Sequence, residues 1–398
     1  MRRLHFALLS LVLAVAAHPL AAATYYVGFC RSSAFGSIGA AVATVPAGST
    51  IDVCPGTYFE QVVISKALTL QGISFNNSSQ VVIAVPSGGL ATTSSIIEGT
   101  LAAQVEVTAG PVTITNITVD GTASSNCPTS TFVYAGIFYA SGSSGTVNEV
   151  ETRNQNCDGR YGFGILAENG AGATQLVTIE NSNINSNSYA GITAGSDQTP
   201  STLTASIKSN YVAGGVVGIS TVLNVGGSVS DNIVVASTSG TGVVASSPSS
   251  LVSKNTVNGG SEGIEVDGAV TVSGNTINGA TYGVFVNAAG SVTSNDISNS
   301  GYGIYFQVNG ATIKTNIITQ APVGIEFGCY TGTASGNTIN GATTGIDRVP
   351  AGFAGVNKFH NVGTVITGGC GDSGLPGRAS VMGVHKIGDK KSGDVLHD

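Results

Sequence analysis

Tryptophan is absent from this 398-residue chain, and charged residues make up only 9% of it. Methionine and histidine are also scarce, at 2 and 5 residues, whereas glycine is abundant at 56 residues. The chain therefore has few charges with which to hold a charged partner, and its many glycines suit turns that need unusual backbone angles. This composition is typical of an elongated all-β protein.

Residues 1–23 have the pattern of a secretory signal peptide. Arg2 and Arg3 precede the apolar run from Leu8 to Ala17, and small residues follow at the cleavage positions. No later run is long and apolar enough to span a bilayer. We therefore expect a secreted protein, extracellular or periplasmic, whose mature chain begins near Thr24 and has no membrane span.

Basic residues are a minority in the mature chain. Without the signal peptide, 13 basic and 22 acidic residues are left, which gives a net charge near −9. This balance disfavours binding to nucleic acids and to anionic membranes. It also weakens the case for a strongly anionic substrate, unless Ca²⁺ bridges the protein and that substrate. We expect a monomer that requires no cofactor, with Ca²⁺ as an optional ligand.

A unit of Asn-x-Ile/Val followed by Gly-Ile/Val recurs every 20 to 23 residues between Asn210 and Asp347. It combines β-branched residues with Gly, Asn and Ser turns, which is typical of a solenoid with one repeat per coil. The sequence therefore predicts an all-β fold, a single-stranded right-handed parallel β-helix. About 13 coils would form a rod on the order of 60 Å long.

Each repeat supplies two apolar positions that should stack inward as ladders, since one coil cannot bury its apolar face alone. The first ladder is Val257, Ile277, Ile297, Ile318 and Ile339, and the second is Ile264, Val284, Ile304, Ile325 and Ile346. The repeated asparagines are expected at an inward-turned corner, where amide side chains bond from coil to coil. That structural role explains them without a catalytic one.

The two ends should differ from the rod. Ile38, Ala41, Val42 and Val45 have helical spacing, which predicts a short capping helix within an N-terminal cap of residues 24–48. The β-helix is expected over residues 49–370. Residues 371–398 lose the repeat and are rich in charge, which predicts a mobile C-terminal tail.

Export would place the six cysteines in an oxidising compartment, where disulfides form. Cys127 follows Val119 by eight residues and Cys157 follows Val150 by seven, so these thiols should be neighbours if the two valines are equivalent in consecutive coils. The remaining pairs would lie near the two ends, Cys30 with Cys54 and Cys329 with Cys370. A metal site is the alternative, but no C-x-x-C is present to favour it.

Five stretches near the N-terminus form a recognisable pattern: Ser37–Val42, Pro46–Ile51, Pro55–Tyr58, Glu60 and Leu68–Gly72. They resemble the first coils of pectin-lyase-like right-handed β-helix proteins, which include pectin methylesterases, alginate epimerases and the periplasmic copper-binding β-helix family. The later repeats are similar to generic carbohydrate-binding and sugar-hydrolase β-helix repeats. The resemblance implies the fold and a carbohydrate partner but no particular activity, because this fold carries many activities.

The sequence motifs typical of particular activities in these families are mostly missing from this chain. The segments typical of pectin methylesterases and polygalacturonases are missing. A copper site would need several His or Met residues, and after processing only His360, His385, His397 and Met382 are left. A β-elimination lyase, with Arg or Lys as base and carboxylates for Ca²⁺, has no rigid motif and stays open.

Two long insertions predict a first candidate site, a lip pinned by Cys127 and Cys157. Regular coils place six residues between the inward residue and the glycine, whereas Val119 to Gly136 takes 17 and Val150 to Gly164 takes 14. Such insertions are commonly the binding side of a solenoid. The candidate catalytic residues are Arg153, Arg160, Glu151 and Asp158, and the candidate substrate-binding residues are Asp120, Tyr134, Tyr139, Tyr161 and Glu168. The alternative is a solvated, salt-bridged loop.

A row of outward residues on the Gly-Ile strands is the second candidate. Strand alternation should place Glu265, Phe285, Tyr305 and Glu326 on one face, one per coil, followed by Asp347. Aromatic rings can stack on sugar rings, and carboxylates accept hydrogen bonds from sugar hydroxyls. The alternative is an ordinary polar outer face.

We therefore predict a secreted β-helix protein that binds or processes extracellular polysaccharide, including uronate-containing ones, through the lip and the adjoining strand face. The residues leave open whether it is an enzyme; an enzyme of this kind would be a polysaccharide lyase or resemble a glycoside hydrolase. A non-catalytic surface, adhesion or structural β-helix protein is the alternative, and whether a metal is bound is not decided.

Overall fold

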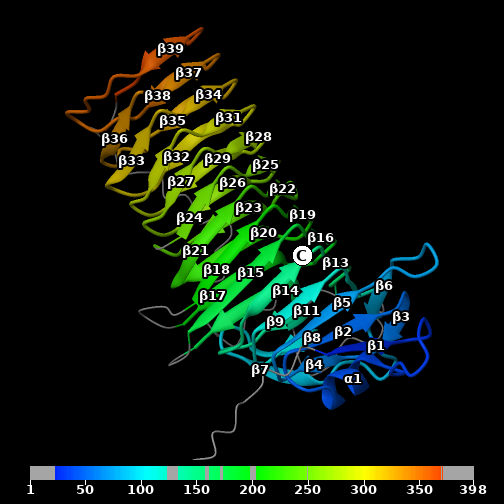
Figure 1. Ribbon diagram of the computed structural model, residues 1–398. Coiled ribbons are helices and arrows are strands. Elements are labelled where there is room, and N and C mark those ends of the chain that lie inside the picture. The colour runs from blue at the N-terminus through cyan, green and yellow to red at the C-terminus, as the bar shows by residue number, and fades with distance from the viewer. Residues whose placement is uncertain are drawn as a thin grey trace, which may run out of the picture.

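The computed structural model describes residues 23–122, 133–156, 161–170, 174–197, 203–248, 250–368 and 370. The chain winds into a rod of successive coils, and each coil adds strands to three long parallel sheets, here called sheets A, B and C (Figure 1). The colours of Figure 1 run steadily from one end of the rod to the other, so coils that are neighbours in sequence are neighbours in space.

Sheet A consists, in order, of β1 (Thr24–Val27), β2 (Ser49–Val53), β5 (Leu68–Gly72), β9 (Val112–Thr115), β12 (Gly145–Asn148), β15 (Gln175–Glu180), β18 (Leu203–Lys208), β21 (Val225–Ser230), β24 (Ser250–Ser253), β27 (Thr271–Ser273), β30 (Ser291–Thr293), β33 (Ala311–Lys314) and β36 (Gly332–Ser335). Sheet B consists of β3 (Gly56–Phe59), β6 (Val81–Ala84), β10 (Thr118–Asp120), β13 (Glu151–Arg153), β16 (Asn183–Asn185), β19 (Tyr211–Ala213), β22 (Ile233–Val235), β25 (Thr256–Asn258), β28 (Thr276–Asn278), β31 (Asp296–Ser298), β34 (Ile317–Thr319), β37 (Thr338–Asn340) and β39 (Lys358–His360). Sheet C consists of β4 (Val62–Ile64), β8 (Gly99–Val107), β11 (Val133–Tyr139), β14 (Tyr161–Asn169), β17 (Ala190–Ser196), β20 (Val217–Leu223), β23 (Thr241–Ala245), β26 (Glu262–Val266), β29 (Tyr282–Val286), β32 (Tyr302–Phe306), β35 (Val323–Glu326), β38 (Thr344–Asp347) and β40 (Thr364–Ile366).

Every pairing between successive coils is parallel within the described residues, and only the additional strand β7 (Thr92–Ser95) pairs antiparallel, with β8. The predicted right-handed parallel β-helix of about 13 coils is thereby confirmed. The predicted capping helix is also present as α1 (Ile38–Thr44). The first strand of sheet A, β1, lies within the segment expected to form the cap and pairs with β2.

The two predicted apolar ladders form the core. Each of their ten residues has no exposed surface, and each pairs in register with its equivalent in the next coil. A parallel solenoid brings identical positions together about every 4.8 Å, so a β-branched residue repeated at one position packs against copies of itself. Burial of these ladders is the main stabilisation of the rod.

The repeated asparagines form the predicted corner ladder between sheets A and B. In each step the backbone N–H and the side-chain Nδ2 of one asparagine both donate to Oδ1 of the next, as Asn275 does to Asn295 at 2.9 Å. Nδ2 also donates to a carbonyl of the preceding coil, here Val252 at 3.1 Å. The ladder runs from Asn210 to Asn357, one rung beyond the predicted repeats. Each buried amide is therefore satisfied by its neighbours.

Disulfides lie near both ends of the rod. Cys30 bonds Cys54 beside the first coil and Cys329 bonds Cys370 at the last ones, as the sequence predicts. Their presence indicates an extracellular or periplasmic protein, because the cytoplasm keeps thiols reduced. The predicted Cys127–Cys157 pair lies outside the described residues.

The expected equivalence of Val119 and Val150 is wrong. Val119 pairs with Thr152, so the second insertion, counted to Gly164, is two residues shorter than expected. Strand β13 begins only at Glu151, and a turn containing Glu149 with a positive φ of 54° precedes it. Both insertions nonetheless leave the same corner of adjacent coils, between sheets B and C.

The predicted signal peptide and C-terminal tail lie outside the described residues, apart from Ala23. Among the residues that the structure describes, no helix is long and apolar enough to cross a membrane.

Candidate functional site

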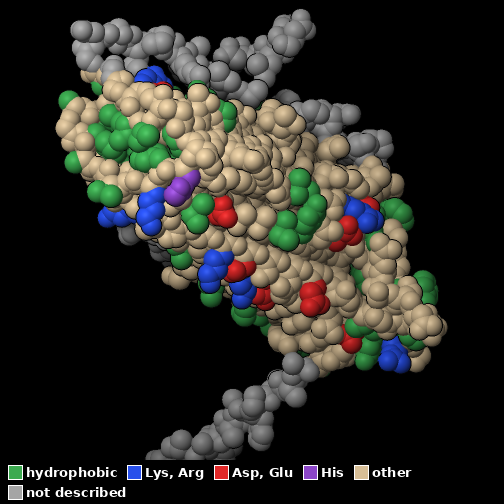
Figure 2. Space-filling model, turned by 90° about the horizontal axis from the view of Figure 1, so that it is seen from above, with side chains coloured by type: hydrophobic (Ala, Val, Ile, Leu, Met, Phe, Trp, Pro, Cys, Tyr) green, Lys and Arg blue, Asp and Glu red, His purple; other side chains and the backbone are tan. Residues whose placement is uncertain are grey.

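Three residues of the predicted lip meet on the outer face of sheet B. Arg153 Nε donates to Asp120 Oδ2 at 2.8 Å, and its Nη1 donates to Glu151 Oε2 at 3.1 Å. The side chains are partly exposed, at 29%, 14% and 28% for Arg153, Asp120 and Glu151. Figure 2 shows one side of the rod, on which charged side chains occur in small mixed groups separated by wide uncharged surface.

The electrostatics of this group do not favour acid–base chemistry. The hydrogen bond to Asp120 raises the pKa of Arg153, so its guanidinium holds its proton even more tightly than a free one and is not available as a general base. Burial by itself would raise the pKa of Asp120, but hydrogen bonds from Thr122, Asn154 and Arg153 lower it below its ordinary value. The group is a partly exposed cluster of one arginine and two carboxylates, of a kind that contributes little stability.

Other lip residues are too deeply buried to reach a ligand. Tyr139 points into the core with no exposed surface, and its hydroxyl donates to Val112 O at 3.1 Å. Tyr134 is 2% exposed and donates to Gln104 Oε1. These two expectations are wrong, because β11 is covered on both faces, by the core and by the segment that ends in β7.

Glu168 is also a structural residue rather than a ligand-binding one. It is 1% exposed and accepts hydrogen bonds from Ser95 Oγ at 2.6 Å, Ile96 N at 2.8 Å and Ile97 N at 3.2 Å. These bonds anchor residues 92–98, here called the strap, over the outer face of sheet C. Burial raises the pKa of the neighbouring Glu98 to about 7, with repulsion from Glu168 adding to the effect.

The remaining lip residues do not complete a site. Tyr161 is 41% exposed and packs edge to face on Tyr189 with ring centroids 4.7 Å apart, on sheet C and away from the ion pairs of sheet B. Asp158 and Arg160 lie outside the described residues. The structure thus divides the predicted lip between two sheets.

The residues of the second candidate lie in a row, one per coil. Glu265 pairs in register with Phe285, Phe285 with Tyr305, Tyr305 with Glu326 and Glu326 with Asp347, all on the outer face of sheet C. The rings of Phe285 and Tyr305 stack with centroids 5.6 Å apart and planes 10° apart. The row therefore continues across five coils, but Glu265, Tyr305 and Glu326 are buried within it.

Two tyrosines that the repeat pattern did not predict lie beside the row and double its width. Tyr282 and Tyr302 stack with centroids 5.3 Å apart, and Tyr282 lies 5.3 Å from Phe285. Strict alternation would place Tyr282 on the face of the inward Val284, but the intervening Gly283 also faces inward, since a Cβ there would lie 2.4 Å from Ile297 Cγ2. The glycine shifts the alternation by one residue. An aromatic residue directly before the repeated glycine is the sequence signal that identifies this position.

The four rings form what we call the aromatic patch: Tyr282, Phe285, Tyr302 and Tyr305. Carbon atoms in contact lie about 3.5–4.0 Å apart. Nearly parallel rings with centroids 5.6 Å apart are therefore displaced sideways, like shingles, and part of a face stays uncovered. Tyr305 is 8% exposed and the other three rings are half-buried.

Carboxylates lie at the N-terminal side of the patch. Asn287 Nδ2 donates to both Glu265 Oε1 and Asp267 Oδ1 at 3.0 Å, and Glu262 accepts from Thr241 Oγ1 at 3.0 Å. Burial raises the pKa of Glu265 to about 8, and repulsion from Asp267 and Glu262 adds to this effect. Glu265 is therefore protonated at neutral pH.

An ion pair lies at the other side of the patch. Arg348 Nε donates to Glu326 Oε1 at 2.8 Å, and Glu326 is 2% exposed. Burial raises the pKa of Glu326, although the hydrogen bond from Arg348 opposes this shift. Among the described residues no three His, Cys, Asp or Glu side chains are grouped so that they could hold a metal ion.

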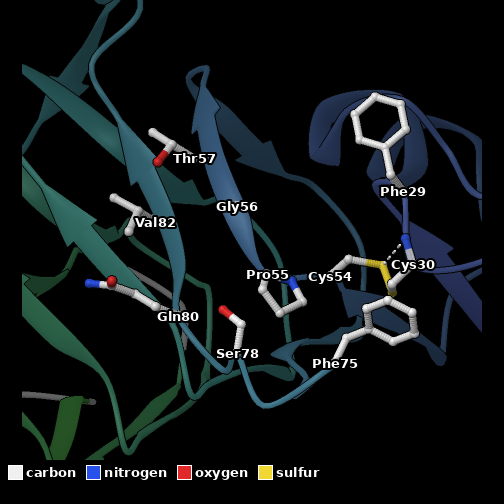
Figure 3. A pocket seen from close by; sticks show the side chains of 10 residues that line it. All are labelled: Phe29, Cys30, Cys54, Pro55, Gly56, Thr57, Phe75, Ser78, Gln80 and Val82. Atoms are coloured by element: carbon white, nitrogen blue, oxygen red, sulfur yellow. Dashed lines mark hydrogen bonds between the residues drawn. A yellow bond between two sulfur atoms is a disulfide. The ribbon is translucent and has the colours of Figure 1, made fainter.

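A separate cleft of about 430 Å³ lies at the N-terminal end of the rod. Figure 3 shows the rings of Phe29 and Phe75 beside the disulfide, with Gln80 and Val82 across the cleft. No residue that lines it carries an ionisable side chain apart from the bonded cysteines. The cleft therefore offers no acid, base or free nucleophile.

A family model described as periplasmic copper-binding protein (NosD) matches residues 198–343, which include the regular repeats. The resemblance to pectin-lyase-like β-helix proteins is confirmed. In the described residues the chain has one histidine, His360, and no methionine, so this part does not fit a copper site. No curated protein matches the chain significantly.

Similar solved structures are also β-helix proteins. The A-module of mannuronan C-5 epimerase AlgE4 from Azotobacter vinelandii is 17% identical, with 83% of this chain and 91% of that chain covered and a TM-score of 0.47. The periplasmic alginate epimerase AlgG is 13% identical, with 84% of each chain covered and a TM-score of 0.45. DFA-IIIase from Arthrobacter chlorophenolicus A6 without its lid is 14% identical, with 86% and 91% covered and a TM-score of 0.43.

Proposed function

We propose that this protein binds an extracellular polysaccharide along the outer face of sheet C, with the aromatic patch as its centre. The observation that carries the proposal is the group of four rings, arranged as shingles on successive coils and bordered by polar side chains on both sides. Aromatic rings on a protein surface are costly to leave solvated and serve most often in recognition.

The shape of the surface suits a chain-like ligand. The rod is straight on the scale of several coils, and equivalent residues follow one another about every 4.8 Å along it (Figure 1). Sugar rings present apolar C–H faces to aromatic rings and hydroxyls to their surroundings. The amide oxygen of Asn287, beside the patch, can accept hydrogen bonds from those hydroxyls.

Binding, rather than turnover, is the role we propose. The sheet B cluster holds its arginine in two ion pairs, and the patch has no free base of suitable strength among the groups described above. Glu265 is 5% exposed and holds its proton at neutral pH, so it is not available to accept a proton from a substrate.

The test is retention of the purified mature chain on a panel of immobilised neutral and acidic glycans. Replacing Phe285 and Tyr302 together by alanine should weaken retention about tenfold or more, since each aromatic contact contributes roughly 0.5–1.5 kcal/mol beyond its buried area. Tyr211→Ala is the matched control, because Tyr211 is 44% exposed on sheet B and lies outside the patch.

The folded state of each variant is checked by its thermal midpoint. Unchanged retention by the double variant, with the parent retained, would reject the patch as the binding surface. A parent chain that no glycan retains would reject glycan binding altogether.

A further inference from the structure

We infer that the aromatic patch takes glycans without carboxylates, and that Glu262, Asp267 and Asp347 repel polyuronates from it. The inference rests on the proposed function, since it names the class of glycan that the same surface accepts. It also assigns a specificity role to residues that need not contribute to affinity.

The charges beside the patch are strongly unequal. Five acidic residues lie beside the rings within the described residues, namely Glu262, Glu265, Asp267, Glu326 and Asp347, and all except the protonated Glu265 carry a negative charge at neutral pH. The single cation of this surface, in the described part of the chain, is Arg348, and its guanidinium is bonded to Glu326 at 2.8 Å. A uronate would therefore meet no unengaged cation here.

The side-chain amide of Asn287, beside the patch, is engaged as well. Asn287 Nδ2 already donates to Glu265 and to Asp267, both at 3.0 Å. Recognition of a sugar carboxylate normally uses a guanidinium in a bidentate arrangement or a set of free N–H donors. The bonds on this surface instead leave acceptor oxygens, which suit sugar hydroxyls.

The shifted pKa of Glu265 agrees with this charge distribution. Glu265 holds its proton up to a pKa of about 8, with burial as the main cause and repulsion from Asp267 and Glu262 as the next. A field that disfavours the ionised form of a resident carboxyl also disfavours an arriving one. Bridging by Ca²⁺ would need a group of oxygen ligands, and no three acidic side chains of the described residues are grouped to provide it.

The experiment compares glycans of equal length that differ in one group. Neutral hexose oligosaccharides and oligogalacturonates or oligomannuronates are titrated against the full mature chain at low ionic strength. The variant is Glu262→Gln with Asp267→Asn, which removes two charges and keeps the side-chain shapes. Glu149→Gln with Asp231→Asn is the control of equal charge change, since both residues are exposed and away from sheet C.

We expect the parent to bind the neutral glycan and to bind the oligouronate at least tenfold more weakly. The patch variant should gain about tenfold or more in oligouronate affinity, while its neutral-glycan affinity changes less than threefold. The control should change neither. Raising the salt concentration should also improve oligouronate binding to the parent, because salt screens repulsion between exposed charges.

Two outcomes would overturn the inference while leaving glycan binding intact. One is a parent chain that binds the oligouronate as tightly as the neutral glycan, with or without added Ca²⁺. The other is a patch variant whose preference between the two glycans equals that of the parent. If the parent binds neither glycan, the proposed function itself is wrong and the inference is rejected with it.

Discussion

The coils from β8 to β20 and those from β21 to β38 share one fold but satisfy their buried polar groups differently. In the described residues every buried side-chain polar atom without a partner lies in the first group: Thr152 Oγ1, Gln155 Oε1, Gln175 Oε1, both side-chain atoms of Asn187, and Thr221 Oγ1. In the second group the buried asparagines bond one another from coil to coil. The buried polar side chains of the second group, here called the regular half, are thus better satisfied than those of the first group, the irregular half.

The difference follows from repetition. A residue repeated at one position of a solenoid meets a copy of itself in the next coil, so an asparagine finds both a donor and an acceptor there. In the irregular half the neighbours differ. Thr152, for example, stands in the ladder position that Ile297 occupies farther along, between Val119 and Ile184.

The two halves also use the outer face of sheet C differently. In the irregular half the strap covers this face and Glu168 holds it in place. In the regular half the aromatic patch lies on the same face, beyond the strap. In the irregular half, an inserted segment therefore covers the outer face of sheet C. In the regular half, the same face carries the candidate binding surface.

The largest effect is expected from Ile297→Asp in the regular half. The substitution places a charge in a closed apolar ladder, so it should lower the free energy of unfolding by several kcal/mol. Urea denaturation measures this change. Ile233→Asp, at a 48% exposed outward position of strand β22, is the control and should change stability by less than about 0.5 kcal/mol. Equal losses in the two variants would contradict the ladder.

An intermediate effect, which depends on pH, is expected from Glu265→Gln. Burial raises the pKa of Glu265 to about 8 in the folded chain, so the folded state holds this proton more tightly than the unfolded state does. Its contribution to stability is complete below about pH 4.5 and is lost as pH rises through about 8. The parent should therefore lose more stability between pH 5 and 8 than the variant. Parallel denaturation midpoints across that range would show that Glu265 is not the group responsible.

The smallest effect is expected in the irregular half, from a substitution of Thr152. Thr152→Val removes a buried hydroxyl that has no partner and keeps the shape of the side chain, so it should raise the free energy of unfolding by about 1 kcal/mol. The exposed Thr276→Val serves as reference and should change stability little. A loss of stability in Thr152→Val would mean that the hydroxyl is satisfied in solution, for example by buried water.

Part of the candidate site could be read from the sequence. The row from Glu265 to Asp347 was predicted because the repeat is regular there, so counting along one coil gives the positions in all of them. The lip could not be read in this way. Counting residues across an insertion gave the wrong register for Val150, and nothing local shows that Val85 and Leu90 pack over Tyr134.

The sequence by itself determined the repeat, and with it the parallel β-helix, the apolar ladders, the asparagine corner and the disulfides at the two ends. These features depend on contacts between equivalent positions, which a period of 20 to 23 residues specifies. The tertiary structure alone decided which outward residues are accessible. Accessibility depends on segments far apart in the chain, as when Ser95 and Glu168 meet, and on the inward glycines that turn Tyr282 and Tyr302 toward the patch. Such contacts follow from packing in three dimensions, which no local pattern records.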